Sequence, residues 1–118
     1  MNIETLKACG INYEKGLARF MDDKELYEMA IGMFPNMTSL ADAERAFAAK
    51  DYAALYDAVH SMKGACGNLD MTDCYLIASD LSKLLHDGDG SDELIAEKFE
   101  AFQKAYRHVL AGIEAAQE

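Results

Sequence analysis

D-Y-A-A-L-Y-D-A-V-H-S-M-K-G-A-C-G-N-L-D, the stretch from Asp51 to Asp70, decides the fold of this chain. Placed on a helix at about 100° per residue, its large apolar side chains fall within about 40° of one line. These side chains are Leu55, Val59, Met62, Cys66 and Leu69. The stretch therefore predicts an amphipathic helix whose apolar stripe is buried in a helical core.

The opposite side of this predicted helix carries a histidine among small residues. His60 lies about 140° from the buried line, and Ala53 and Gly64 lie about 160° and 180° from it. A glycine inside a helix costs roughly 0.8 to 1 kcal/mol relative to alanine, so Gly64 and Gly67 are hard to explain by stability. Because glycine has no Cβ, they leave a bare strip against which another protein could press. Lys63 puts an ammonium within reach of a group attached to the ring, which suits a phosphoryl group.

The segment H-S-M-K-G from His60 to Gly64, continued by A-C-G-N-L, resembles the H-x-x-K-G signature of histidine-containing phosphotransfer (HPt) domains. The resemblance covers most of the chain, because the helices expected on either side of this segment also fit the layout of that family. The sequence departs from the pattern at Asp70, where a glycine usually follows the leucine. This departure concerns the turn after the helix, and not the histidine.

The resemblance implies a role for each residue on the exposed face. His60 would accept a phosphoryl group from an aspartyl phosphate on a receiver domain and pass it to an aspartate on another receiver. Lys63 would partly neutralise the phosphate, and Gly64 would let the ring enter the receiver's acidic, magnesium-containing pocket. The docking surface would be lined by Ala53, Tyr56, Gly67 and Asn68. The implied partners are response-regulator receiver domains and a hybrid histidine kinase, and the magnesium would belong to the receiver.

An imidazole can carry a phosphoryl group without a separate base. Its unperturbed pKa of about 6.5 leaves much of the population neutral and nucleophilic near pH 7. Phosphoryl transfer needs mainly in-line positioning and charge neutralisation, which a partner can supply. The chain has no G-x-x-x-x-G-K-[ST] loop and no G-x-G-x-x-G motif. We therefore expect a phosphoryl carrier that is not an enzyme and has no metal or other cofactor of its own.

Composition limits the partners and the location. The length of 118 residues suits one domain over 1–118, with a bundle over roughly residues 23–117. With 21 acidic and 11 basic side chains, the formal charge of −10 argues against general electrostatic binding of nucleic acid or of an anionic membrane. The start M-N-I-E-T-L-K lacks signal-peptide features and no apolar run could span a membrane, so we expect a cytosolic protein. We also expect a whole chain, a monomer and three free thiols, at Cys9, Cys66 and Cys74.

The rest of the chain predicts helices, and no stretch alternates as a strand would. Helices are expected over 3–9, 13–21, 39–50 and 72–86, the first of them peripheral. A further helix is expected after Asp22, which Pro35 ends or kinks, and a last one after Ser91. The expected caps include Asp22, Asp51, Asp70 with Thr72, and Ser91. The expected fold is all-α, an antiparallel four-helix bundle with one or two short extra helices at the N-terminus.

Two of these helices show which side should be buried. In the helix before Pro35 the apolar side is marked by Leu26, Ala30 and Met33. The last helix has the clearest seam, with spacings of 4, 3, 4, 3 and 4 between Ile95, Phe99, Phe102, Tyr106, Val109 and Ile113. The seven methionines are expected to fill the core.

Plainer interpretations of the single residues stay open. An exposed histidine is usually a polar surface residue, although a lysine and two glycines on the same face favour phosphotransfer. Gly64 and Gly67 could instead admit the N-terminal helix, and Asp57 could orient the imidazole or be an ordinary surface acid. His86 fits a helix end and His108 a surface position, and no K-G follows His108.

Two other functions compete with phosphotransfer. A di-metal site in a four-helix bundle needs E-x-x-H on two helices, and this chain offers only Asp57-x-x-His60 with the histidine outward, so we reject it. The stronger rival is a helical adaptor or sequestering module that binds a receiver or kinase without being phosphorylated. The intact histidine, lysine and glycine argue against that rival.

Overall fold

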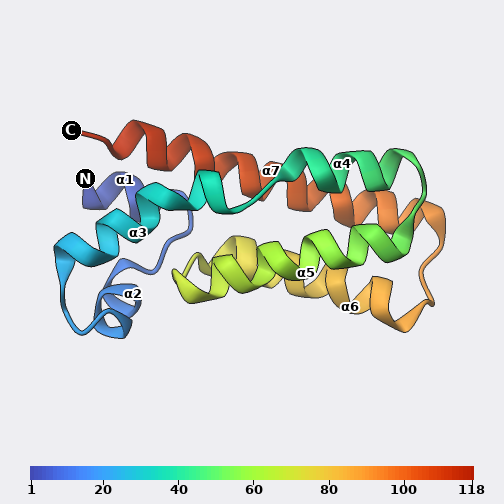
Figure 1. Ribbon diagram of the computed structural model, residues 1–118, viewed down its shortest axis with the longest axis horizontal. Helices are drawn as coiled ribbons and strands as arrows, with labels where there is room; N and C mark the ends of the chain where they lie inside the picture. The colour runs from blue at the N-terminus through green and yellow to red at the C-terminus, as the bar shows by residue number, and fades with distance from the viewer.

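The computed structural model describes residues 1–118 and consists of seven helices (Figure 1). In chain order they are α1 (Ile3–Ala8), α2 (Tyr13–Arg19), α3 (Lys24–Met37), α4 (Leu40–Ala48), α5 (Tyr52–Asn68), α6 (Thr72–Asp87) and α7 (Asp92–Ala116). The chain has no strand, so the expected all-α fold is confirmed. None of the helices combines the length and the apolar character needed to cross a membrane.

Helices α4 to α7 form an antiparallel bundle in which α5 packs against α4 and α6, and α6 packs against α7 (Figure 1). Their ends follow local signals in the sequence. The side chain of Asp51 accepts a hydrogen bond from the backbone N–H of Ala54 at the start of α5, and Ser91 does the same for Leu94 in α7. Gly88 ends α6 in the left-handed conformation, with φ of 72°. The expected bundle, with α1 and α2 as the two short extra helices, is confirmed.

The seam of α7 supplies much of the core. Its predicted residues are all buried: Ile95, Phe99, Phe102, Tyr106, Val109 and Ile113. The helix extends along the whole molecule, so one half packs against α6 while the other packs against α1 (Figure 1). One long apolar stripe therefore joins the bundle to the N-terminal helices.

The first helix is part of the core, and the prediction that it is peripheral is wrong. Leu6 is fully buried, and the backbone N–H of Asn2 donates to the carbonyl of Ala116 at 2.8 Å. A Cβ on Gly112 of α7 would lie 2.5 Å from the Sγ of Cys9, so the lack of a side chain there lets the two segments approach. A six-residue helix is too short to reveal this packing through its own periodicity.

The buried face of α3 is displaced by one residue from the predicted face. Tyr27, Ile31 and Phe34 are fully buried, whereas Leu26 and Met33 are 47% and 52% exposed. Both sets of residues have helical spacing, and the larger aromatic side chains occupy the core because they bury more apolar surface.

The start of α3 also differs from prediction. Asp23, and not Asp22, caps the helix with its side chain, because Asp22 lies in the preceding turn with φ of 62°. The helix continues past Pro35 and ends at Met37, after which Ser39 caps α4. Together α3 and α4 form one interrupted helix that lies along α7 (Figure 1).

Most methionines lie at the surface, contrary to the prediction that they fill the core. The four with more than half of the side chain exposed are Met21, Met29, Met33 and Met37. Met62 and Met71 are buried.

The turn between α5 and α6 is tied to the N-terminal segment. Asp70 has φ of 56° and is 5% exposed, and its carboxylate accepts hydrogen bonds from Arg19 Nε at 2.8 Å and Nη2 at 3.3 Å. Its backbone carbonyl accepts the N–H of Asn12 at 2.8 Å. The prediction that Asp70 and Thr72 cap α6 is wrong, because the cap position is Met71 and makes no side-chain hydrogen bond. The carboxylate of Asp70 is engaged by Arg19 instead.

Candidate functional site

Helix α5 presents one face to the core and the other to solvent. Its predicted stripe is buried, comprising Leu55, Val59, Met62 and Cys66, with Leu69 just after the helix. The opposite face therefore points outward by helical geometry. Of the residues predicted for the site, Ala53, His60, Gly64 and Asn68 are exposed, and Tyr56, Lys63 and Gly67 are half-buried. All seven lie on α5, so one helix brings them together.

The imidazole of His60 is held by ring stacking. The ring of Tyr56, one turn earlier, lies nearly parallel to it, with centroids 5.5 Å apart and planes 18° apart. The ring of His86, from α6, lies 5.8 Å from Tyr56 on a tilted plane. The stacked neighbour of His60 is thus Tyr56, and the ring of Tyr56 is in turn in contact with α6.

The nitrogens of His60 are free of the protein's own hydrogen bonds. The other two histidines are engaged: His86 Nδ1 is 3.5 Å from Asp87, and His108 Nε2 is 3.2 Å from the carbonyl of Ala8. A histidine nitrogen forms bonds in the plane of its ring, through the lone pair, whereas stacking occupies a face. The contact with Tyr56 therefore orients the ring without covering either nitrogen.

The two glycines of α5 have different surroundings. A Cβ built on Gly64 would meet no atom within 4 Å, so the surface beside His60 is open there. A Cβ on Gly67 would lie 3.0 Å from the ring of Tyr75 in α6. Neither glycine admits the N-terminal helix, but Gly67 does allow a close contact within the bundle.

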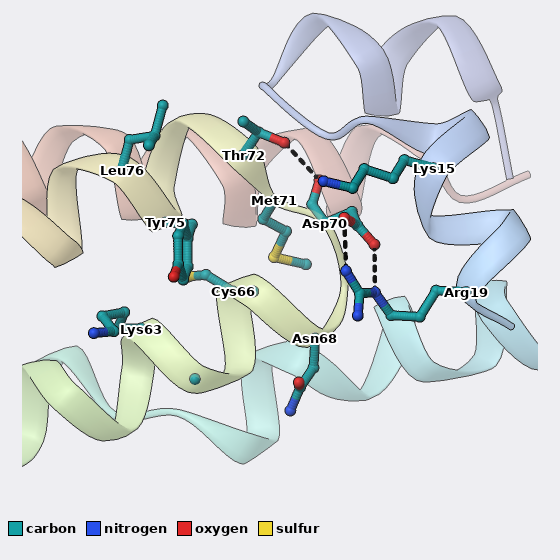
Figure 2. Close-up of a pocket in the computed structure, with 12 residues that line it drawn as sticks. Lys15, Arg19, Lys63, Cys66, Asn68, Asp70, Met71, Thr72, Tyr75 and Leu76 are labelled. Carbon is teal, nitrogen blue, oxygen red and sulfur yellow. Dashed lines mark hydrogen bonds and ion pairs between the residues drawn. The ribbon is translucent and has the colours of Figure 1, made fainter.

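A groove of about 550 Å³ begins at Lys63 and Gly64 and extends along α5 toward α2. Figure 2 shows Lys63 and Tyr75 at one end of it, with Lys15 and Arg19 at the other. The hydrogen bonds that Arg19 donates to Asp70 raise the pKa of the guanidinium, so Arg19 stays positively charged at neutral pH. The groove thus carries positive side chains from two helices.

Sequence reasoning missed the part of the groove that lies outside α5. The missed residues are Lys15, Arg19, Met71, Thr72, Tyr75 and Leu76. Arg19 and Asp70 are 51 residues apart, and no local pattern links them. The departure from the HPt pattern at Asp70 was the only signal in the sequence that the turn after α5 has a partner of its own.

The cysteines lie in the core. Cys9, Cys66 and Cys74 are free thiols and all are buried, as expected for thiols without a disulfide or zinc pattern. A hydrogen bond with Cys74 and burial raise the pKa of Cys66, which also borders the groove, so that its thiol stays protonated at neutral pH. The face of α5 that carries His60 therefore exposes an imidazole and no thiol.

Comparison with known proteins identifies the family. The family model described as Hpt domain matches residues 36–116, which includes α4 to α7 and the whole of α5. No curated protein and no solved structure matches the chain. The matched segment holds His60, Lys63 and Gly64, while α1, α2 and most of α3 precede it. The chain belongs to the Hpt domain family, whose members are phosphocarrier modules that interact with receiver domains and kinases in two-component phosphorelays.

Proposed function

We propose that this protein is a phosphorelay intermediate and that His60 is the residue that carries the phosphoryl group. It accepts the group from an aspartyl phosphate on one receiver domain and gives it to an aspartate on another. The observation that carries this proposal is the imidazole itself, exposed, stacked on Tyr56 and without a hydrogen bond on either nitrogen, beside an open strip at Gly64.

The transfer step needs no reactant other than the imidazole and the aspartyl phosphate. The lone pair of one ring nitrogen attacks phosphorus in line with the aspartyl oxygen, a P–N bond forms, and the P–O bond breaks. The leaving carboxylate takes the electron pair, and the other ring nitrogen keeps its proton. Transfer to the second receiver runs the same step in reverse, so the two exchanges share one geometry.

The neighbours of His60 have roles that follow from their positions. Lys63, three residues on, lies on the same face within reach of a phosphoryl group and partly neutralises its charge. Gly64 lets the partner's backbone approach the ring. The docking surface continues over Ala53, Tyr56, Gly67 and Asn68, which flank this strip along α5.

The protein acts in this scheme as a carrier and not as a kinase. The receiver supplies the magnesium ion and the acidic pocket, so the chain needs no cofactor of its own. Its partners are response-regulator receivers and a hybrid histidine kinase that starts the relay. The monomeric state and the cytosolic location expected from the sequence remain predictions within this proposal.

Label transfer tests the proposal. Purified protein is incubated with a receiver domain phosphorylated on its aspartate with labelled phosphate. We expect label on the protein as an acid-labile, base-stable adduct, lost in His60→Gln and kept in His108→Gln and His86→Gln. Circular dichroism checks that the His60→Gln protein is still helical.

Two outcomes would contradict the proposal. Label retained in folded His60→Gln would assign phosphorylation to another residue. Binding to receivers with no label taken from any receiver of the same genome would leave the adaptor interpretation as the better one.

A further inference from the structure

Basic side chains without an acidic partner gather on one face of this acidic protein. Of its 11 Lys and Arg residues, eight lie within 4.0 Å of a carboxylate oxygen. The three that remain unpaired are Lys15, Lys63 and Lys83. In a chain of formal charge −10, these ammonium groups are the uncompensated positive charges, so their location is informative.

Two of the three line the groove beside His60. Lys63 stands at the end nearest the histidine, and Lys15 of α2 extends from the other end toward the start of α6 (Figure 2). The third is on α6. Contacts of Gly67 with Tyr75 and of Tyr56 with His86 set the antiparallel register of α5 and α6, and this register puts the exposed Lys83 close to the level of the histidine.

The position of α2 is fixed by a charged contact. Arg19 at its end donates two hydrogen bonds to the buried carboxylate of Asp70, and the N–H of Asn12 before it donates to the carbonyl of the same residue. The N–H of Asp73 donates to the carbonyl of Gly10 at 3.4 Å. These contacts join α2 and the segment before it to the turn between α5 and α6. They therefore fix the position of Lys15 at the end of the groove.

On α5 itself, the acidic side chain nearest to His60 in the sequence lies on the other side of the helix from Lys63. Asp57 is exposed one turn before the histidine, and helical geometry puts it about 120° from Lys63 around the axis of α5. On α5 itself, the positive charge of Lys63 therefore lies toward the groove, and the negative charge of Asp57 lies on the other side. Such a polarised face orients a charged partner as well as attracting it.

We infer that α2 belongs to the partner-docking surface and that Lys15, Lys63 and Lys83 form a positive flank that fits the acidic rim of the receiver domain. This inference rests on the proposed function, since it takes the receiver as the partner that meets His60. It extends the surface beyond the segment that matches the Hpt domain, because α2 precedes residue 36. The occupant is a protein surface rich in carboxylates, which the charge of the flank complements.

Charge reversal on α2 tests this directly. Lys15→Glu is compared with Lys104→Glu, which makes the same change of net charge at an exposed lysine of α7 paired with Glu100 in its own helix. The second-order rate of transfer from a phosphorylated receiver is measured at low and at high salt. We expect Lys15→Glu to lower this rate roughly three- to tenfold at low salt, with the loss shrinking as salt screens the charges, and Lys104→Glu to have little effect.

A small phosphodonor separates this inference from the proposed function. Phosphoramidate needs no docking surface, so it should phosphorylate His60 equally well in wild type, Lys15→Glu and Lys104→Glu. If neither phosphoramidate nor any receiver phosphorylates His60 in the wild type, the proposed function fails and this inference fails with it. If the wild type is phosphorylated and the two reversals have equal effects, or an effect independent of salt, the inference alone is overturned.

Release of α2 provides a second test. The double variant Arg19→Gln with Asp70→Gly removes the contact without leaving a buried charge, and glycine suits the left-handed backbone at position 70. We expect faster hydrogen exchange over residues 13–19, a reduced rate with the receiver and an unchanged rate with phosphoramidate. Faster exchange in α2 together with a wild-type rate from the receiver would show that α2 lies outside the docking surface.

Discussion

Replacing Gly64 by alanine should make the protein more stable and a poorer phosphoryl carrier. A Cβ at this position meets no atom within 4 Å, so the new methyl group strains nothing in the fold. Alanine in a helix interior is favoured over glycine by about 1 kcal/mol. For a chain of this length that gain corresponds to a rise in melting temperature of about 4 °C.

In the proposed transfer, the same methyl group would stand where the receiver approaches the imidazole. Overpacking of a close contact typically costs about 1 to 3 kcal/mol, and each 1.36 kcal/mol is a factor of about ten in rate. We therefore expect transfer from a phosphorylated receiver to fall by roughly 5- to 160-fold in Gly64→Ala. Gly64→Gln, with its longer side chain, should fall further.

Gly67→Ala is the matched control for the change in helix propensity. Its Cβ would lie 3.0 Å from Cε1 of Tyr75, so the ring must move by a few tenths of an ångström. Because Tyr75 is partly exposed, this shift is possible but offsets part of the gain. We expect Gly67→Ala to stabilise the protein less than Gly64→Ala does.

Urea denaturation followed by circular dichroism measures the stabilities, and label transfer measures the rates. Phosphoramidate reports whether the histidine still reacts when no protein has to dock. A Gly64→Ala protein less stable than wild type would show that the strip is not open. A folded Gly64→Gln protein that transfers at the wild-type rate would refute the argument from clearance.

Three further predictions concern the cap of α5, the ring stacked on His60 and the stability of the fold at high pH. Asp51→Ala should destabilise the protein by about 1 kcal/mol, through loss of the cap on α5, while phosphoramidate still modifies the folded protein at the normal rate. Tyr56→Ala should slow modification of His60 by receiver and phosphoramidate alike, because the ring loses its stacked neighbour, whereas Tyr56→Phe should keep the rate. Burial and the hydrogen bond to Glu28 raise the pKa of Tyr13 to about 12. The protonated Tyr13 hydroxyl therefore contributes its full share to the stability of the fold below pH 10. This contribution, about 3 kcal/mol, is lost as pH rises toward 12. Urea denaturation over this pH range should show a smaller loss of stability in Tyr13→Phe than in the wild type.

Periodicity predicted the helices well, but it chose the wrong face of α3. The residues Leu26 and Met33 have helical spacing, and so have Tyr27, Ile31 and Phe34. Both sets of residues therefore satisfy the helical period, and periodicity alone does not say which set is buried. That depends on which side of the helix the rest of the chain packs against. In α7 the choice was plain, because the apolar stripe is long and its other faces are polar.

The candidate site also has one part that the sequence predicted and one part that it did not. The face of α5 follows from helical geometry alone, because its residues belong to one element whose buried stripe fixes the outward direction. The far wall of the groove comes from α2 and α6, and depends on the contact between Arg19 and Asp70. A contact between residues so distant in the chain leaves no periodic trace, although the unusual residue at position 70 marked the place.

Three unrelated properties of the molecule coincide in the surroundings of His60. Every other glycine has a positive φ or would bring a Cβ within 4 Å of a neighbour, whereas Gly64 does neither. The other histidines are hydrogen-bonded, and all but three of the basic side chains have a carboxylate partner. An open glycine lowers helix stability, while an unbonded imidazole and unpaired ammonium groups add nothing to it. Folding alone gives no reason for these properties to coincide around His60, whereas a surface that must receive an acidic partner and exchange a phosphoryl group with it requires all three.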